Sequence, residues 1–164
     1  MRQLSVTDAD AYGLSSSGRR RDARGLAIRT GRSENRPMPK VILVAVGGAV
    51  GSVLRYAASG ATQELLRSYT FPVGTLLVNL VGCFLLGAGS HLADTRGAFG
   101  DSARALLFIG VLGGFTTFSA FSNETFNLFR SGSTLLAWVN VTAQLAGGLA
   151  CVWLGRSLAF VVWR

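Results

Sequence analysis

Hydrophobic residues form four long runs that are separated by short polar connections. The runs are Val41–Ser59, Phe71–Ala93, Ala103–Phe129 and Leu135–Trp163. A bilayer core about 30 Å thick is crossed by about 20 predominantly apolar residues of α-helix, so each run is long enough to span it. Arg55 interrupts the first run, and its long side chain can extend toward the membrane surface. We therefore expect an all-α integral membrane protein with four transmembrane helices.

The N-terminal segment has a different character. Residues 1–37 are rich in Arg, Ser and Gly and have no apolar period, which is typical of a disordered basic tail. A second interpretation is that Met38 is the natural start and that residues 1–37 are a mis-annotated extension. Under this hypothesis translation from Met38 gives the functional protein. Both interpretations leave residues 38–164 as the four-helix transmembrane domain.

Composition and charge exclude several functional classes. The chain is 49% hydrophobic and 15% charged, whereas soluble domains carry about 25% charged residues. Nine of the sixteen basic residues lie in residues 1–40, and no basic stripe with interleaved aromatic residues follows. We expect no nucleic-acid partner, because juxtamembrane basic residues account for the charge. The single histidine, His91, has no second histidine and no cysteine beside it, so we expect no metal cluster, and no nucleophile–base pair indicates an enzyme.

Glycines recur where helices are expected to touch. Gly47 and Gly51 are four residues apart, as are Gly110 and Gly114, and a Gly–Gly pair lies in the fourth run. Small residues at this spacing let two helix backbones approach closely in lipid. The pattern predicts tight helix packing or a dimer.

Polar residues inside the apolar runs are the candidates for function. Asn79 lies among Leu and Val residues, and its amide either bonds another helix or faces an ion path. In the third run, Gly113–Gly114 predicts a broken helix, whose freed carbonyls need protein, water or an ion as partners. Phe118 and Phe121 lie one turn apart and either pack or present their positive ring edges to an anion. A run of six polar residues is too polar to face lipid: Thr116, Thr117, Ser119, Ser122, Asn123 and Glu124.

Three segments together resemble the CrcB/Fluc family of fluoride channels: GGAVGSVLRY (47–56), FPVGTLLVNLVGCFLLG (71–87) and GGFTTFSAFSNE (113–124). The resemblance covers essentially residues 38–155. It implies a fluoride-selective channel that exports fluoride passively across the plasma membrane. It also implies four-helix subunits in lipid that assemble as antiparallel, dual-topology homodimers, with a structural sodium ion at the centre. Pairing with a related second subunit remains an alternative.

The resemblance also implies roles for individual residues. The backbone carbonyls of Gly113 and Thr116 are expected to bind sodium, and Asn79 to donate its amide hydrogens to fluoride. Phe118 and Phe121 match the pore phenylalanines of the family. The candidates for a polar track along the pore are Thr117, Ser119 and Ser122. Ala120 stands where the family usually has Thr. Glu124 matches an acidic residue of the motif, and the resemblance implies no role for it. The fourth helix matches loosely, and Thr142 and Gln144 are further pore candidates there.

Two other functional classes fit the sequence less well. A small four-helix, dual-topology multidrug exporter needs an acidic residue in the middle of its first helix, and residues 41–59 contain none. A non-transporting scaffold subunit accounts for the glycines but not for Asn79 and the hydroxyl-rich third helix. Fluoride conduction is therefore the leading hypothesis.

Overall fold

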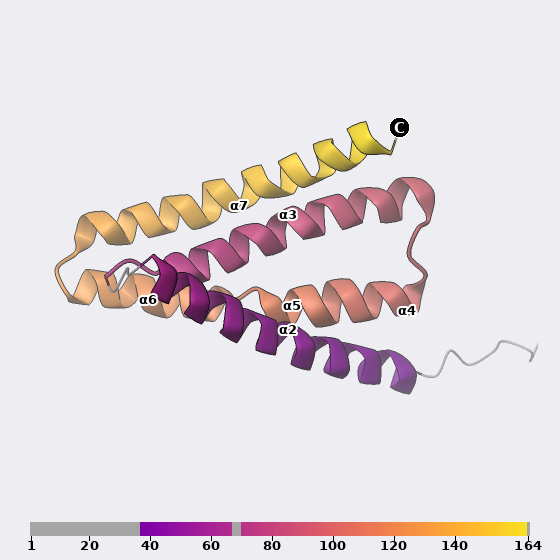
Figure 1. Cartoon of the computed structure of the whole chain (residues 1–164), viewed down its shortest axis with the longest axis horizontal. Helices are drawn as coiled ribbons and strands as arrows, with labels where there is room; N and C mark the ends of the chain where they lie inside the picture. Colours follow the sequence, from indigo (N-terminus) through magenta and orange to yellow (C-terminus); the bar gives the residue numbers. More distant parts are fainter. Residues whose placement is uncertain (1–36, 67–69, 164) are drawn as a thin grey trace, which may run out of the picture. The chain divides into compact units, whose positions relative to one another are not determined.

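The computed structural model describes residues 37–66 and 70–163; the expectations for the basic tail fall on residues outside this part of the chain. Every regular element in the described part is helical (Figure 1). The elements in chain order are α2 (Pro37–Leu65), α3 (Val73–Arg96), α4 (Asp101–Arg104), the π-helix η3 (Ala105–Leu112), α5 (Gly113–Phe115), α6 (Phe118–Arg130) and α7 (Thr134–Val162). Helices α3 and α7 lie side by side, and α2 packs on η3 and α5.

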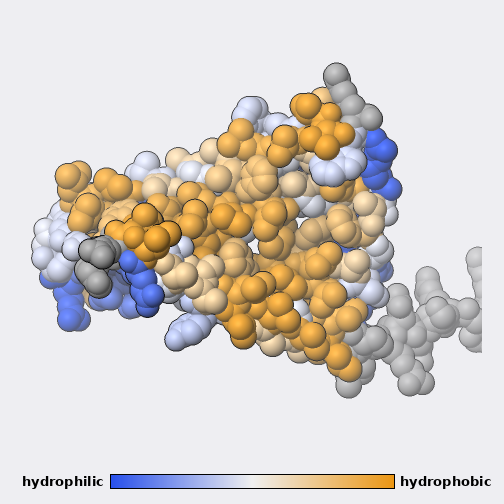
Figure 2. All heavy atoms as spheres, in the orientation of Figure 1, coloured by the Kyte–Doolittle hydropathy of each residue, from blue (hydrophilic) through white to orange (hydrophobic). Residues whose placement is uncertain are grey.

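Four helical stretches of the described chain are long and apolar enough to cross a membrane. They are Lys40–Leu65, Val73–Arg96, Asp101–Arg130 and Thr134–Val162. Large apolar side chains cover the outside of these stretches, and hydrophilic residues gather toward their ends (Figure 2). Ile109, for example, is 64% exposed, as expected for a side chain that faces lipid. The prediction of an all-α protein with four spans is confirmed.

The third span changes conformation along its length. Gly113 has helical φ and ψ of −65° and −36°, and Gly114 lies in the short helix α5. The backbone then becomes extended at Thr116 (φ −84°, ψ 155°) and Thr117 (φ −150°, ψ 115°) before α6 begins at Phe118. The helix is therefore interrupted at the two threonines, and the prediction of a break at Gly113–Gly114 is wrong in position by a few residues.

The chemistry of the threonines explains this position. β-Branched residues are well suited to extended backbone, and the hydroxyl of Thr117 accepts a hydrogen bond from the backbone N–H of Ala120 (3.2 Å), which caps α6. Gly114 serves close packing instead. A Cβ atom added there would lie 2.5 Å from the carbonyl oxygen of Gly48 in α2.

Gly47 and Gly51, two more of the predicted contact glycines, lie at the same crossing of α2 with the third span. A Cβ on Gly47 would lie 2.5 Å from the Leu106 carbonyl oxygen, and a Cβ on Gly51 would lie 2.8 Å from the backbone nitrogen of Phe115. These distances are shorter than van der Waals contact allows, so only glycine fits. The tight packing that the spacing predicted is present within one chain.

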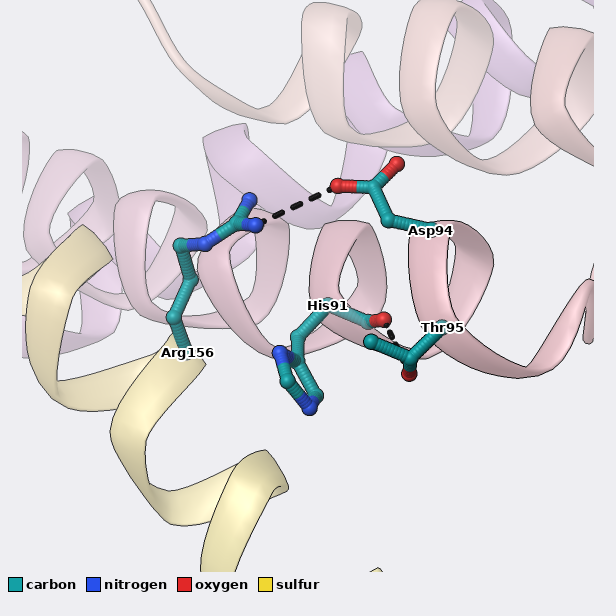
Figure 3. Close-up of polar contacts among 4 residues, drawn as sticks. All are labelled: His91, Asp94, Thr95 and Arg156. Carbon is teal, nitrogen blue, oxygen red and sulfur yellow. Dashed lines mark hydrogen bonds and ion pairs between the residues drawn. The ribbon is translucent and has the colours of Figure 1, made fainter.

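Ion pairs join the helices at one end of the bundle. Arg156 of α7 reaches Asp94 of α3 at 3.2 Å (Figure 3), and Lys40 at the start of α2 pairs with Asp101 at 3.0 Å. Exposed pairs of this kind contribute little to stability, because water screens both charges. Their position beyond the apolar surface indicates where the helices leave the membrane core.

Candidate functional site

The side chain of Asn79 is bonded to the interruption of the third span. Its Nδ2 donates to the carbonyl oxygen of Thr117 (3.1 Å), and its Oδ1 accepts from the Thr117 backbone N–H (2.8 Å). The carboxamide thus pairs with the main chain of Thr117 as a peptide group does in a sheet. Asn79 also donates from Nδ2 to the side-chain oxygen Oε1 of Gln144 (3.0 Å), so one residue of α3 links the interruption to α7.

These bonds occupy the donor capacity of Asn79. A primary amide has two N–H donors, and Nδ2 of Asn79 donates to Thr117 and to Gln144. The sequence left open whether Asn79 bonds a helix or faces an ion. In this structure it bonds two other segments, and both of its N–H donors are used in these bonds.

The same bonds explain which carbonyls the interruption sets free. In an α-helix the Gly113 carbonyl accepts from residue 117 and the Thr116 carbonyl accepts from residue 120. Here the Thr117 N–H is donated to Asn79, and the Ala120 N–H is donated to the Thr117 hydroxyl. Both carbonyls therefore lose their helical donors.

The carbonyl of Gly114, between Gly113 and Thr116 in the chain, accepts a hydrogen bond from another helix. Arg55 of α2 donates from Nε to the Gly114 carbonyl oxygen at 3.2 Å. The arginine that interrupted the first apolar run is thus held inside the bundle by the third span, and it does not extend freely to the surface. It satisfies one of the acceptors that the interruption creates.

A cavity of about 290 Å³ lies beside the interruption. Its lining includes Asn79, Gly113, Thr116, Thr117, Phe118, Phe121 and Gln144. The rings of Phe118 and Phe121 meet edge to face, with centroids 5.4 Å apart and planes at 64°. Phe121 is buried, whereas Phe118 is 73% exposed, so one wall of this cavity is open in a single chain.

A second cavity, of about 860 Å³, is also lined by Thr117. Its polar lining includes Arg55, Thr75 and Glu124. The Thr75 hydroxyl donates to Oε1 of Glu124 at 2.6 Å, whereas Oε2 of Glu124 is buried without a partner among the described residues. Glu124 is therefore bonded to α3 inside the bundle.

Two of the predicted polar-track residues lie outside both linings. Ser119 and Ser122 are exposed on α6. The hydroxyl of Ser119 is 3.2 Å from that of Thr117, and Ser122 donates to the Phe118 carbonyl at 2.9 Å. They follow the exposed side of the interruption, next to Phe118.

Sequence reasoning missed a buried link that holds Phe121 in place. Asn140 of α7 is fully buried and donates to the Thr125 hydroxyl at 2.8 Å, and that hydroxyl donates to the Phe121 carbonyl at 2.8 Å. Arg55 and Thr75 were likewise not designated as site residues. For Thr75 a signal existed, because it lies four residues before Asn79 and so shares its helix face.

Comparison with known proteins assigns the family. The sequence profile described as "CrcB-like protein, Camphor Resistance (CrcB)" matches residues 42–156. The chain is 41% identical over 121 residues to the fluoride-specific ion channel FluC of Methylobacillus flagellatus, covering 74% of this chain and 94% of that protein. It is 46% identical over 123 residues to FluC of a Roseiflexus species, covering 74% and 98%. With four apolar spans and these matches, the chain is a multi-pass membrane protein of the CrcB family.

Proposed function

We propose that this protein is a fluoride-selective channel through which fluoride leaves the cell passively across the plasma membrane. The observation that carries the proposal is the cavity in which the Asn79–Thr117–Gln144 cluster lies beside the ring pair of Phe118 and Phe121. Aromatic ring edges are electropositive and amides donate hydrogen bonds. The relatives named as fluoride-specific channels support the same function.

The energetics favour many weak donors over one strong site. Moving an anion of carboxylate size into a low-dielectric interior costs on the order of 20 kcal/mol before relaxation. A hydrogen bond to a charged group returns about 1.5–3 kcal/mol, so a single amide is insufficient and a row of donors is needed. Conduction also requires that each site release the ion, which suits neutral donors. Thr117 lines both cavities, so we propose that fluoride passes there.

The other proposed pore residues extend this row of hydrogen-bond donors. Asn79 lies at the junction, Phe118 and Phe121 present ring edges, and Ser119 and Ser122 continue the polar track on the exposed side of α6. The exposure of Phe118 supports a second chain that closes the pore, because a pore wall of one chain is open to its surroundings. We propose an antiparallel, dual-topology homodimer, with pairing to a related subunit as the alternative.

We further propose that a structural sodium ion lies between the two copies. The carbonyls of Gly113 and Thr116 lack their helical donors, and both residues line the same cavity. Two carbonyls from each copy supply four hard oxygen ligands, the type that alkali and alkaline-earth cations prefer. Its positive charge stabilises the fluoride ions nearby.

The proposal is tested by ion efflux from liposomes that contain the purified protein. We expect rapid fluoride release and far slower chloride release, because closely spaced donors suit the smaller anion. Protein-free liposomes set the background for both ions. Equal fluoride and chloride fluxes, or fluoride release at the background rate, contradict the proposed function.

A further inference from the structure

Within the channel proposed above, on which this inference rests, we propose that Gln144 is the residue that presents a free amide to fluoride. Asn79 is then a positioning residue, which holds the interruption and orients the Gln144 side chain. The assignment rests on the direction of a short chain of hydrogen bonds that runs from the main chain of Thr117 through Asn79 to Gln144.

The direction of this chain is determined at its origin. A backbone N–H only donates and a backbone carbonyl only accepts. Thr117 therefore sets the oxygen of the Asn79 amide toward its N–H and the nitrogen toward its carbonyl. The same nitrogen then donates to Gln144, so the Gln144 atom facing it must be the oxygen. A flipped Gln144 amide would place its NH₂ group against the NH₂ group of Asn79, two donors without an acceptor. The flip is therefore excluded, and the Gln144 NH₂ group is the last member of this chain of hydrogen bonds.

That NH₂ group has no partner in the described part of the protein. Gln144 is 9% exposed, and its Nε2 is buried without a hydrogen bond to the described residues. A buried donor without an acceptor is unfavourable. Gln144 lines the 290 Å³ cavity together with Phe118 and Phe121, so an anion in that cavity supplies the missing acceptor.

The other buried atoms without partners have the opposite polarity. In the described residues these are Oε2 of Glu124 and Oδ1 of Asn140, both oxygens of groups that accept hydrogen bonds. Neither residue lines the 290 Å³ cavity. Among these three atoms of the described residues, Gln144 Nε2 is thus the nitrogen donor, and its residue lines the same cavity as Phe118 and Phe121.

The first test measures fluoride efflux for two variants of Gln144. Gln144→Glu keeps an oxygen for Asn79 but loses the NH₂ group, and Gln144→Met loses both. Because a hydrogen bond to an ion contributes about 1.5–3 kcal/mol, we expect roughly ten- to a hundredfold slower efflux for both. Ser157→Ala, a loss of a polar group on the same helix α7 at a residue that lines neither cavity, should retain flux. If Gln144→Met conducts fluoride as fast as the wild-type protein, this inference alone is overturned. If the wild-type protein itself conducts no fluoride, the proposed function is overturned as well.

The second test separates a ligand from a structural role. In ¹⁵N-labelled protein in detergent, the side-chain amide signals of Gln144 are assigned from their loss in Gln144→Glu, and those of Asn79 from their loss in Asn79→Asp. We expect addition of fluoride, but not chloride, to move the Gln144 NH₂ signals downfield and to leave the Asn79 signals nearly unchanged. Movement of the Asn79 signals with fixed Gln144 signals overturns the assignment, whatever the variants do to flux.

Discussion

Asn79 of α3 and Thr117 of the third span are joined by two hydrogen bonds, of 3.1 and 2.8 Å, between one side-chain amide and one main-chain peptide unit. This pairing takes the Thr117 N–H away from the helix and holds the extended backbone at a point where α5 ends and α6 begins. The interruption is therefore a structured junction between two helices, stabilised from outside the third span.

The first prediction concerns this pairing. Asn79→Asp keeps the acceptor for the Thr117 N–H but places a carboxyl oxygen against two other oxygens, those of Thr117 and Gln144. We expect fluoride flux to be abolished and the free energy of unfolding to fall by about 1–3 kcal/mol. Liposome efflux and thermal melting in detergent measure the two effects. Asn123→Asp, on the exposed side of α6, is the control and should leave the melting temperature nearly unchanged.

The second prediction concerns the pore phenylalanines. Phe118→Ile and Phe121→Ile remove the electropositive ring edges, and since edge interactions contribute about 0.5–1.5 kcal/mol, flux should fall by up to roughly tenfold in each. Size-exclusion chromatography should still report the wild-type assembly. Phe126→Ile changes an exposed ring of α6 that does not line the cavity, and it should conduct normally. If both pore variants conduct like wild type, the two rings serve packing only.

The third prediction concerns sodium. Exchange of all sodium for a large organic cation should slow fluoride efflux and lower the melting temperature, because the Gly113 and Thr116 carbonyls then face one another without a cation between them. Return of sodium should restore both readouts, and potassium should restore them less well. Identical melting and flux in sodium-free buffer would count against the proposed ion.

The fourth prediction tests the close crossing of α2 with the third span. In Gly51→Ala the new Cβ overlaps the main chain at Val111 and lies 2.8 Å from the Phe115 nitrogen. Overpacking of this kind costs about 1–3 kcal/mol, so we expect a clearly lower melting temperature. Gly48→Ala is the matched control, because a Cβ there has no atom within 4 Å among the described residues. Equal stability of the two variants would show that the crossing can open without cost.

Part of this architecture was predictable because it depends on local composition. The four spans follow from the length of the apolar runs, since each helix satisfies its own backbone hydrogen bonds in lipid whatever its neighbours are. The glycine contacts at Gly47 and Gly51 also followed from spacing alone. Three motifs together, one of them around Phe118 and Phe121, indicate the family from sequence alone.

The position and the chemistry of the interruption depended on partners far away in the chain. A Gly–Gly pair is the strongest local signal for a break, yet Gly113 and Gly114 stay helical, and Gly114 instead serves the close approach of α2 at Gly48. Thr117 leaves the helix since Asn79, 38 residues earlier, offers an acceptor for its N–H. The pairing of Asn79 with Gln144 spans 65 residues, and no local periodicity encodes it. Helix formation is a short-range property, so the sequence alone determined the spans, whereas only tertiary packing decided which polar atoms were satisfied and which remained free to meet an ion.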